Sequence, residues 1–141
     1  MQPKPTTRRA FMGQCATCAL ALPAAKLLGG CAVDVLSSAF TLDLTGFPNL
    51  DIVDQTVFVD VGLRQPLAIT RTGTGDADFI VLGSECNHLN CGVERVGEGY
   101  TCPCHGSKFA SDGALLEGPA SAGLSQYTFT LDGDLMTIHP R

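Results

Sequence analysis

The sequence predicts a small all-β domain, in which an antiparallel β-sheet base carries a small metal-binding insertion. Short β-branched or alternating runs, which are typical of strands, occur before residue 83 and after residue 126. No long apolar pattern with a helical period appears after residue 30, and cysteines and histidines gather between residues 86 and 105. The chain has 141 residues, and those after position 30 are enough for one small domain.

Three strands are predicted before the insertion, at residues 56–61, 66–71 and 79–82. Residues 72–76 (TGTGD) predict a turn between the second and the third of them. The third strand is short and apolar, and it leads directly into the first loop that contains cysteine and histidine. We therefore expect this strand to hold that loop.

Two more strands are predicted near the end of the chain, at residues 127–131 and 135–138. They flank residues 132–134 (DGD). An Asp-Gly pair between alternating runs predicts a β-hairpin, because glycine adopts the positive φ angle that such turns require. We expect this hairpin to complete a base formed by residues 33–80 and 124–141.

Two loops carry the strongest functional signal. A Cys-x-His in the first loop is paired with a Cys-x-x-His in the second, which gives two thiolates and two imidazoles for a metal, from Cys86, His88, Cys102 and His105. Cys91 and Cys104 lie in the same loops, although a four-ligand set does not need them. The same four ligands could hold zinc tetrahedrally and only cross-link a small domain. Separately, Cys91 and Cys104 could be two free buried thiols.

The two loops resemble the cluster-binding loops of Rieske iron–sulfur proteins. The similarity rests on residues 86–92 (CNHLNCG) and 102–107 (CPCHGS), and it is greatest to the disulfide-bearing branch found in cytochrome bc complexes and their soluble relatives. Residues 118–120 (GPA) are more weakly similar to the family's proline loop. The resemblance implies a Rieske-type fold over residues 33–141, with a cluster-binding subdomain at about 79–123.

The resemblance also implies a [2Fe-2S] cluster and its ligands. Cys86 and Cys102 would hold one iron, His88 and His105 the other, and Cys91 and Cys104 would form a disulfide. Residues expected around the ligands are Leu89, Ser107, Phe109 and Pro119. Leu89 could belong to the core or form an apolar lip that excludes water, and Pro119 would be a backbone wall beside the cluster. Ser107 would donate a hydrogen bond to sulfur.

The chain departs from the family pattern in two places. The segment between the loops is a few residues shorter than is usual in the respiratory proteins, and Phe109 stands where those proteins often carry a tyrosine. Because phenylalanine cannot donate a hydrogen bond to a cluster sulfur, we predict a reduction potential below that of the tyrosine-bearing relatives.

The ligand types themselves predict a function. Replacing two thiolates by neutral imidazoles lowers the negative charge, so an added electron meets less repulsion. The reduction potential is then about −150 to +300 mV, against about −400 mV with four cysteines. An oxidised iron also withdraws charge from imidazole, so exposed ring nitrogens lose protons more easily. We predict a one-electron carrier with proton-coupled histidine ligands and no catalytic activity of its own.

Two other functions share these ligands. One is the Rieske subunit of a larger oxidoreductase, either a quinol-oxidising bc complex or a molybdenum enzyme such as arsenite oxidase. The lack of a convincing long membrane helix weighs against an ordinary bc-complex subunit. The other is the ferredoxin component or oxygenase domain of a ring-hydroxylating system. It fits less well, because those proteins resemble this chain without the disulfide pair or an export signal.

Residues 1–30 predict a targeting segment that is separate from the fold. Residues 7–12 (TRRAFM) have a twin-arginine signature, and an apolar stretch at 16–28 follows, interrupted by Pro23 and Lys26. A spanning helix needs about 20 apolar residues, so this stretch is too short and too broken to be one. Twin-arginine export carries folded proteins, which would allow a cluster to be inserted first. The alternative is a poorly structured basic tail.

The end of this segment predicts a lipid anchor. Residues 28–31 (LGGC) resemble a bacterial lipobox, which would make Cys31 the acylated first residue of the mature protein. A soluble cleaved form and an uncleaved anchor are the alternatives. Each form places the domain in the periplasm or on the outer face of the membrane, where a disulfide persists. Of the seven cysteines, the remaining two, Cys15 and Cys18, lie within the signal.

The mature domain is predicted to be acidic. Residues 1–30 contain four basic side chains and no acidic one, so their removal changes the formal net charge from −5 to −9. This charge argues against nucleic acid as a partner, because phosphates require a basic face. The expected partner is a redox protein, a cytochrome or a larger oxidoreductase, that presents positive charge.

Overall fold

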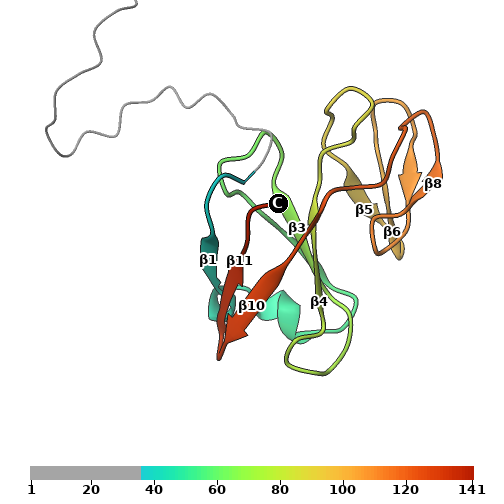
Figure 1. The fold of residues 1–141 in the computed structure, drawn as a ribbon. Coiled ribbons are helices and arrows are strands. Elements are labelled where there is room, and N and C mark those ends of the chain that lie inside the picture. Colours follow the sequence, from blue (N-terminus) through green and yellow to red (C-terminus); the bar gives the residue numbers. More distant parts are fainter. Residues whose placement is uncertain (1–35) are drawn as a thin grey trace, which may run out of the picture.

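A computed structural model of the chain describes residues 36–141, which form three antiparallel sheets (Figure 1). The first sheet has the order β1 (Phe40–Asp43), β11 (Leu135–Ile138) and β10 (Phe129–Asp132). The middle sheet has the order β2 (Thr56–Val59), β3 (Leu67–Arg71), β4 (Phe79–Gly83) and β9 (Gln126–Tyr127). The third has the order β5 (Glu94–Val96), β6 (Gly99–Thr101), β7 (Lys108–Phe109) and β8 (Leu115–Glu117).

The predicted all-β class is confirmed, and within residues 36–141 helical structure is limited to two short 3-10 turns. These turns, η1 (Leu44–Gly46) and η2 (Pro48–Asp51), connect β1 to β2. Within residues 36–141 there is no helix with the length and apolar character needed to cross a membrane. The predicted targeting segment and Cys31 lie outside the described residues.

The predicted hairpin near the end of the chain is formed by β10 and β11. Asp132 pairs with Leu135, and Gly133 begins the intervening two-residue turn with a φ angle of 58°. The strand predicted at residues 127–131 is divided into two. β9 pairs with β4 in the middle sheet, whereas β10 pairs with β11 in the first sheet. The chain changes sheets at Thr128, and alternation of side chains along the sequence does not reveal such a change.

The two central strands of the middle sheet are buried on both faces. Successive side chains of a strand point to opposite faces, and Leu67, Ala68, Ile69 and Thr70 of β3 are all buried. One face packs on the first sheet in a core that includes Leu67, Ile69, Val81, Met136 and Ile138. The other face packs on the segment between β4 and β9, in a core that includes Ala68, Leu82, Tyr100, Phe109 and both Cys86 and Cys102.

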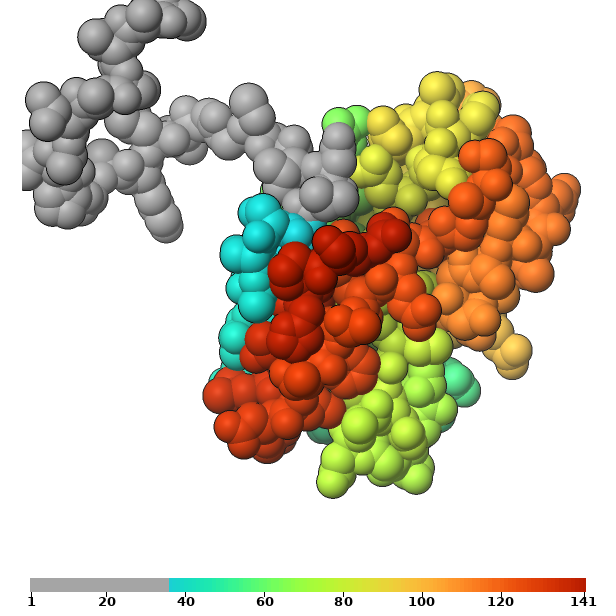
Figure 2. Space-filling model, viewed as in Figure 1, coloured from blue at the N-terminus to red at the C-terminus, as the bar shows by residue number. Residues whose placement is uncertain are grey.

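The segment between β4 and β9 is therefore a lobe with its own sheet, β5 to β8, and it packs on the middle sheet of the base. In Figure 2 the lobe is coloured yellow to orange and lies beside the base. The expected start of the cluster-binding subdomain, at about residue 79, coincides with the start of β4. That strand pairs with β3 and β9, so in the hydrogen-bonding pattern the lobe begins after β4.

Hydrogen bonds between hydroxyl groups cross the boundary between base and lobe. Thr70 Oγ1 lies 2.9 Å from Tyr100 Oη, and both side chains are almost fully buried. Thr56 Oγ1 lies 2.7 Å from Thr70 Oγ1, so the hydroxyls of β2, β3 and β6 form a chain. Tyr100 is two residues before Cys102. This chain therefore fixes the strand that enters the second ligand loop.

We predict that Thr70→Val destabilises the fold. Valine has nearly the same shape as threonine but leaves the buried Tyr100 hydroxyl without a partner, which costs about 1–3 kcal/mol. The measurement is the midpoint of denaturant unfolding, followed by circular dichroism. Thr41→Val is the matched control, because the hydrogen bond between Thr41 and Thr137 is exposed. Equal stability of the two variants would contradict a structural role for the buried hydroxyl chain.

Candidate metal centre

The first ligand loop is a tight turn that begins three residues after β4. The Cys86 N–H donates to Cys91 O at 2.8 Å, and the Asn90 N–H donates to Cys86 O at 2.9 Å. Asn90 has a φ angle of 60°, in the left-handed region that asparagine tolerates better than most residues. The turn places Cys86 at its buried base and His88 near its exposed end.

The second ligand loop repeats the same hydrogen-bond pattern. The Cys102 N–H donates to Ser107 O at 2.8 Å, and the Gly106 N–H donates to Cys102 O at 2.9 Å. Gly106, with a φ angle of 80°, occupies the position in the second loop that is equivalent to Asn90 in the first loop. Cys86 and Cys102 thus occupy equivalent positions in two matching loops.

Cys86 and Cys102 are free thiols, and both are buried. Burial raises the pKa of the Cys86 thiol, and the neighbouring Cys102 adds to the rise. Hydrogen bonds from the His88 N–H and the Ser107 hydroxyl lower that pKa, but they do not outweigh burial. A buried pair of thiols becomes a pair of thiolates when a metal supplies compensating positive charge. The pair therefore suits metal binding.

His88 and His105 lie at the surface beside each other. Their ring centroids are 4.7 Å apart with an interplanar angle of 88°, and both residues are exposed. The structure thus brings all four predicted ligands to the same pair of loops. The sulfur donors are on the buried side, and the imidazoles are on the solvent side.

The predicted disulfide between Cys91 and Cys104 is confirmed. Their Cα atoms are 6.5 Å apart, and the bond joins the two ligand loops. The sulfur of Cys102 lies within 4.8 Å of both disulfide sulfurs, a distance at which three cysteines could share a metal. However, sulfurs that are bonded to each other cannot act as thiolate ligands, so among the cysteines of residues 36–141 the available thiolate donors are Cys86 and Cys102.

The residues expected around the ligands have different environments. Ser107 is fully buried, and its hydroxyl accepts a hydrogen bond from the Ala120 N–H at 2.9 Å. Phe109 is buried opposite Tyr100 in the core that contains the two thiols. Leu89 is 63% exposed, so it does not belong to the core. Pro119 is exposed and follows a cis peptide bond.

Polar contacts that the sequence did not reveal hold the loops in place. The Ser121 N–H donates to Asn87 Oδ1 at 3.2 Å, so residues 118–121 are bound to the first loop as well as to Ser107. From the base, Gln65 Nε2 donates to Asn90 O at 3.2 Å. Gln65 and Ser121 lie outside the motifs of the two loops, so only their positions in space identify these contacts.

The Asn90 side chain connects the first loop to two charged groups. With the amide oriented to satisfy both neighbours, its nitrogen donates to Glu85 Oε1 at 3.0 Å and its oxygen accepts from Arg64 Nη1 at 2.8 Å. Asn90 is therefore held through both its backbone and its side chain. The backbone turn of the first loop is in this way attached to the β2–β3 connection.

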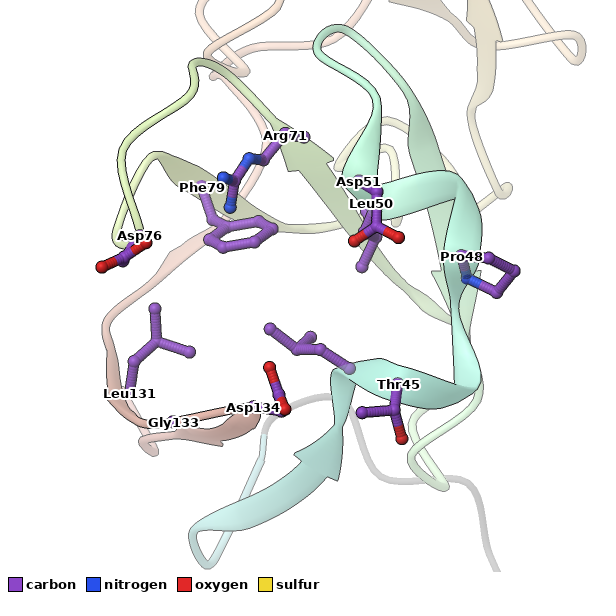
Figure 3. Close-up of a pocket in the computed structure, with 11 residues that line it drawn as sticks. Thr45, Pro48, Leu50, Asp51, Arg71, Asp76, Phe79, Leu131, Gly133 and Asp134 are labelled. Atoms are coloured by element: carbon purple, nitrogen blue, oxygen red, sulfur yellow. The ribbon is translucent and has the colours of Figure 1, made fainter.

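A separate pocket of about 750 Å³ lies in the base (Figure 3). Leu50, Phe79 and Leu131 form apolar parts of its wall, and the Arg71 guanidinium stands 4.5 Å from the centroid of the Phe79 ring. Asp134 also lines it. Its wall contains none of the four predicted metal ligands, so this hollow is not part of the candidate metal centre.

Comparisons with known proteins identify the family to which the two ligand loops belong. Residues 48–128 match the family model of the Rieske [2Fe-2S] domain. The cytochrome b6-f complex iron-sulfur subunit of Synechococcus sp. (strain JA-2-3B'a(2-13)) is 43% identical over 78 residues, which cover 47% of this chain and 45% of that protein. The mitochondrial cytochrome b-c1 complex Rieske subunit of Bos taurus is 38% identical over 90 residues, which cover 61% of this chain and 32% of that protein. The chain thus spans under half the length of these relatives.

Solved structures share the fold. A chain of a hyperthermophilic respiratory Complex III matches with a TM-score of 0.53 and 21% identity, over 68% of this chain and 71% of that chain. A quaternary ammonium Rieske monooxygenase matches with a TM-score of 0.53 and 16% identity, over 77% of this chain and 32% of that chain. At such identities the similarity shows the fold alone. Because the family model covers more than half of the sequence, the chain belongs to the Rieske [2Fe-2S] domain family.

Proposed function

We propose that the protein transfers single electrons through a [2Fe-2S] cluster held by Cys86, Cys102, His88 and His105. The observation that carries this proposal is the pair of matching loops, with two buried free thiols behind two exposed imidazoles. When bound, a cluster with this donor set supplies one-electron redox chemistry at about −150 to +300 mV. The donor types and their placement fit such a cluster.

The protein's own residues provide position, burial and an exit. The core around Cys86 and Cys102 keeps water from the sulfur side, and the Ser107 hydroxyl donates a hydrogen bond toward Cys86. On the other side His88 and His105 expose their ring edges, which serve as the electron exit and as the place where protons are exchanged with solvent. The exposed Leu89 side chain provides an apolar lip next to this exit.

We infer that a redox protein docks at the exposed histidines. Relatives of this chain are named as subunits of cytochrome b6-f and b-c1 complexes, which supports a partner of the cytochrome or larger oxidoreductase type. The acidic balance of the sequence favours a partner with positive charge. We propose that the chain acts as a carrier in its own right, with membership of a larger complex as the second possibility.

We further propose that the domain, residues 33–141, works outside the cytoplasm. The twin-arginine signature of residues 7–12 and the lipobox-like residues 28–31 support export and acylation of Cys31. The disulfide between Cys91 and Cys104 supports an oxidising compartment. Intact-mass measurement of the membrane fraction tests this: a diacylglyceryl group on Cys31 is the expected result, and an unmodified mature chain would exclude lipid anchoring.

The first prediction from this function concerns the cluster and its ligands. The purified protein should contain iron and sulfide in equal amounts and give a reduced-cluster signal in electron paramagnetic resonance. Its reduction potential should fall as pH rises, since deprotonation of the exposed imidazoles stabilises the oxidised form. His88→Ala should lose the cluster, whereas His139→Ala, a histidine at the end of β11, should keep it. Stoichiometric zinc without sulfide would refute the electron-transfer function.

The second prediction concerns the disulfide. The double variant Cys91→Ser/Cys104→Ser should lose the cluster faster on warming or show a lower reduction potential, because the two loops are no longer joined. A disulfide that closes a loop of this size, 13 residues apart in sequence, contributes about 3 kcal/mol to stability. Thr41→Val is the control, since it removes an exposed hydrogen bond in the base and leaves both ligand loops unchanged. An unchanged rate of cluster loss and an unchanged potential would show that the cross-link does not support the centre.

The third prediction concerns Phe109. Phe109→Tyr should raise the reduction potential if the new hydroxyl donates to a cluster sulfur. One hydrogen bond of about 1 kcal/mol corresponds to about 40 mV for a one-electron couple. Phe129→Tyr, which changes an aromatic side chain packed against the other core, should leave the potential unchanged. If Phe109→Tyr loses stability without a rise in potential, the hydroxyl is buried without a sulfur partner.

A further inference from the structure

Three cysteine sulfurs of this protein lie close together, two of them oxidised in a disulfide and one of them a reduced thiol. Cys91 and Cys104 form a disulfide, and the free thiol of Cys102 lies within 4.8 Å of both of its sulfurs. The other free thiol, Cys86, does not belong to this group of three. Thiolate attack on a disulfide needs only access and a suitable approach. Cys102 is therefore the free thiol that the structure places next to both sulfurs of the disulfide.

Burial keeps competing reagents away from Cys102. Cys102 is 1% exposed, so oxidants and thiols in solution do not reach it, whereas the neighbouring disulfide is already at hand. Fixing two reacting groups next to each other replaces an encounter between molecules and raises the rate accordingly. Within the described chain, the disulfide is thus the electrophile that a Cys102 thiolate meets first.

We propose that, in the cluster-free protein, Cys102 exchanges with the disulfide and releases Cys104. The Cys102 thiolate attacks the sulfur of Cys91, a Cys91–Cys102 bond forms, and the Cys91–Cys104 bond breaks. Cys104 leaves as a thiolate and takes up a proton from water. One disulfide is lost and one is formed, so no external oxidant or reductant is needed. The alternative product would join Cys102 to Cys104 across Pro103 alone, whose ring restricts the backbone.

The consequence is a loss of the ligand set. A sulfur bonded to Cys91 cannot hold iron, so the exchanged protein has only one of its two sulfur ligands. This step rests on the proposed function, because it takes Cys102 to be a cluster ligand. A bound cluster prevents the exchange, since it occupies the Cys102 sulfur. The cluster therefore preserves the Cys91–Cys104 disulfide. Cluster-free protein that has undergone the exchange can no longer bind a cluster with both sulfur ligands.

Two variants that both lack a ligand cysteine separate loss of the cluster from exchange with the disulfide. Cys86→Ser and Cys102→Ser should both lose the cluster, but only Cys86→Ser retains the attacking thiol. Each full-length protein, still folded, is treated with iodoacetamide at about pH 8, where thiolates form readily. It is then unfolded, and the remaining thiols are labelled with N-ethylmaleimide. Cys104 is exposed, so a released Cys104 takes the first label, and fragmentation of the tryptic peptides locates it.

The proposal expects at least tenfold more iodoacetamide on Cys104 in Cys86→Ser than in Cys102→Ser, with Cys91 linked to Cys102. The wild-type protein with its cluster should show no label on Cys104. After its cluster has been removed, it should behave like Cys86→Ser, which covers the case in which that variant does not fold. An intact Cys91–Cys104 bond in both cluster-free proteins would overturn the exchange. A Cys86→Ser protein that keeps iron and sulfide would instead refute the ligand assignment.

Discussion

The burial of two free thiols is the constraint on which the rest of the lobe depends. Cys86 and Cys102 belong to the same core as Leu82, Tyr100 and Phe109, so these ligand atoms are also packing atoms. Burial opposes the formation of thiolates, as the raised pKa of Cys86 shows. A metal reverses this preference, because its charge compensates that of the sulfurs. Cluster binding and packing of the lobe are therefore coupled, and loss of one weakens the other.

The middle sheet transmits this coupling to the base. Its strands β3 and β4 are buried on both faces, so the lobe and the first sheet pack on the same backbone. At the lobe face, the polar group of Thr70 meets Tyr100. Apolar contacts alone tolerate small shifts of the lobe along the sheet, whereas a buried hydrogen bond requires a specific alignment. The position of the second ligand loop is thus fixed by contacts with β3. The position of the first ligand loop is fixed by the end of β4, which precedes it in the chain.

Much of the centre could be predicted from the sequence because its chemistry is local. Cys86 with His88, and Cys102 with His105, have spacings that fit one loop each, and Gly133 indicated the hairpin by its turn chemistry. The change of sheet at Thr128 could not be predicted, since both strands show the same alternation. Contacts such as Asn87 with Ser121 were also hidden, because the two residues are 34 positions apart and Ser121 lies outside every motif.

The matching hydrogen bonds of the two loops explain how different sequences give equivalent ligand positions. Both turns need a residue in the left-handed region at the fifth position, and Asn90 and Gly106 meet this need in different ways. Asparagine keeps a side chain, which contacts Glu85 and Arg64, whereas glycine leaves the second turn open at the surface. The first loop is therefore attached to the base on its outer side. The second loop has no such attachment among the contacts described, and it depends on the disulfide and on Ser107 to keep its register.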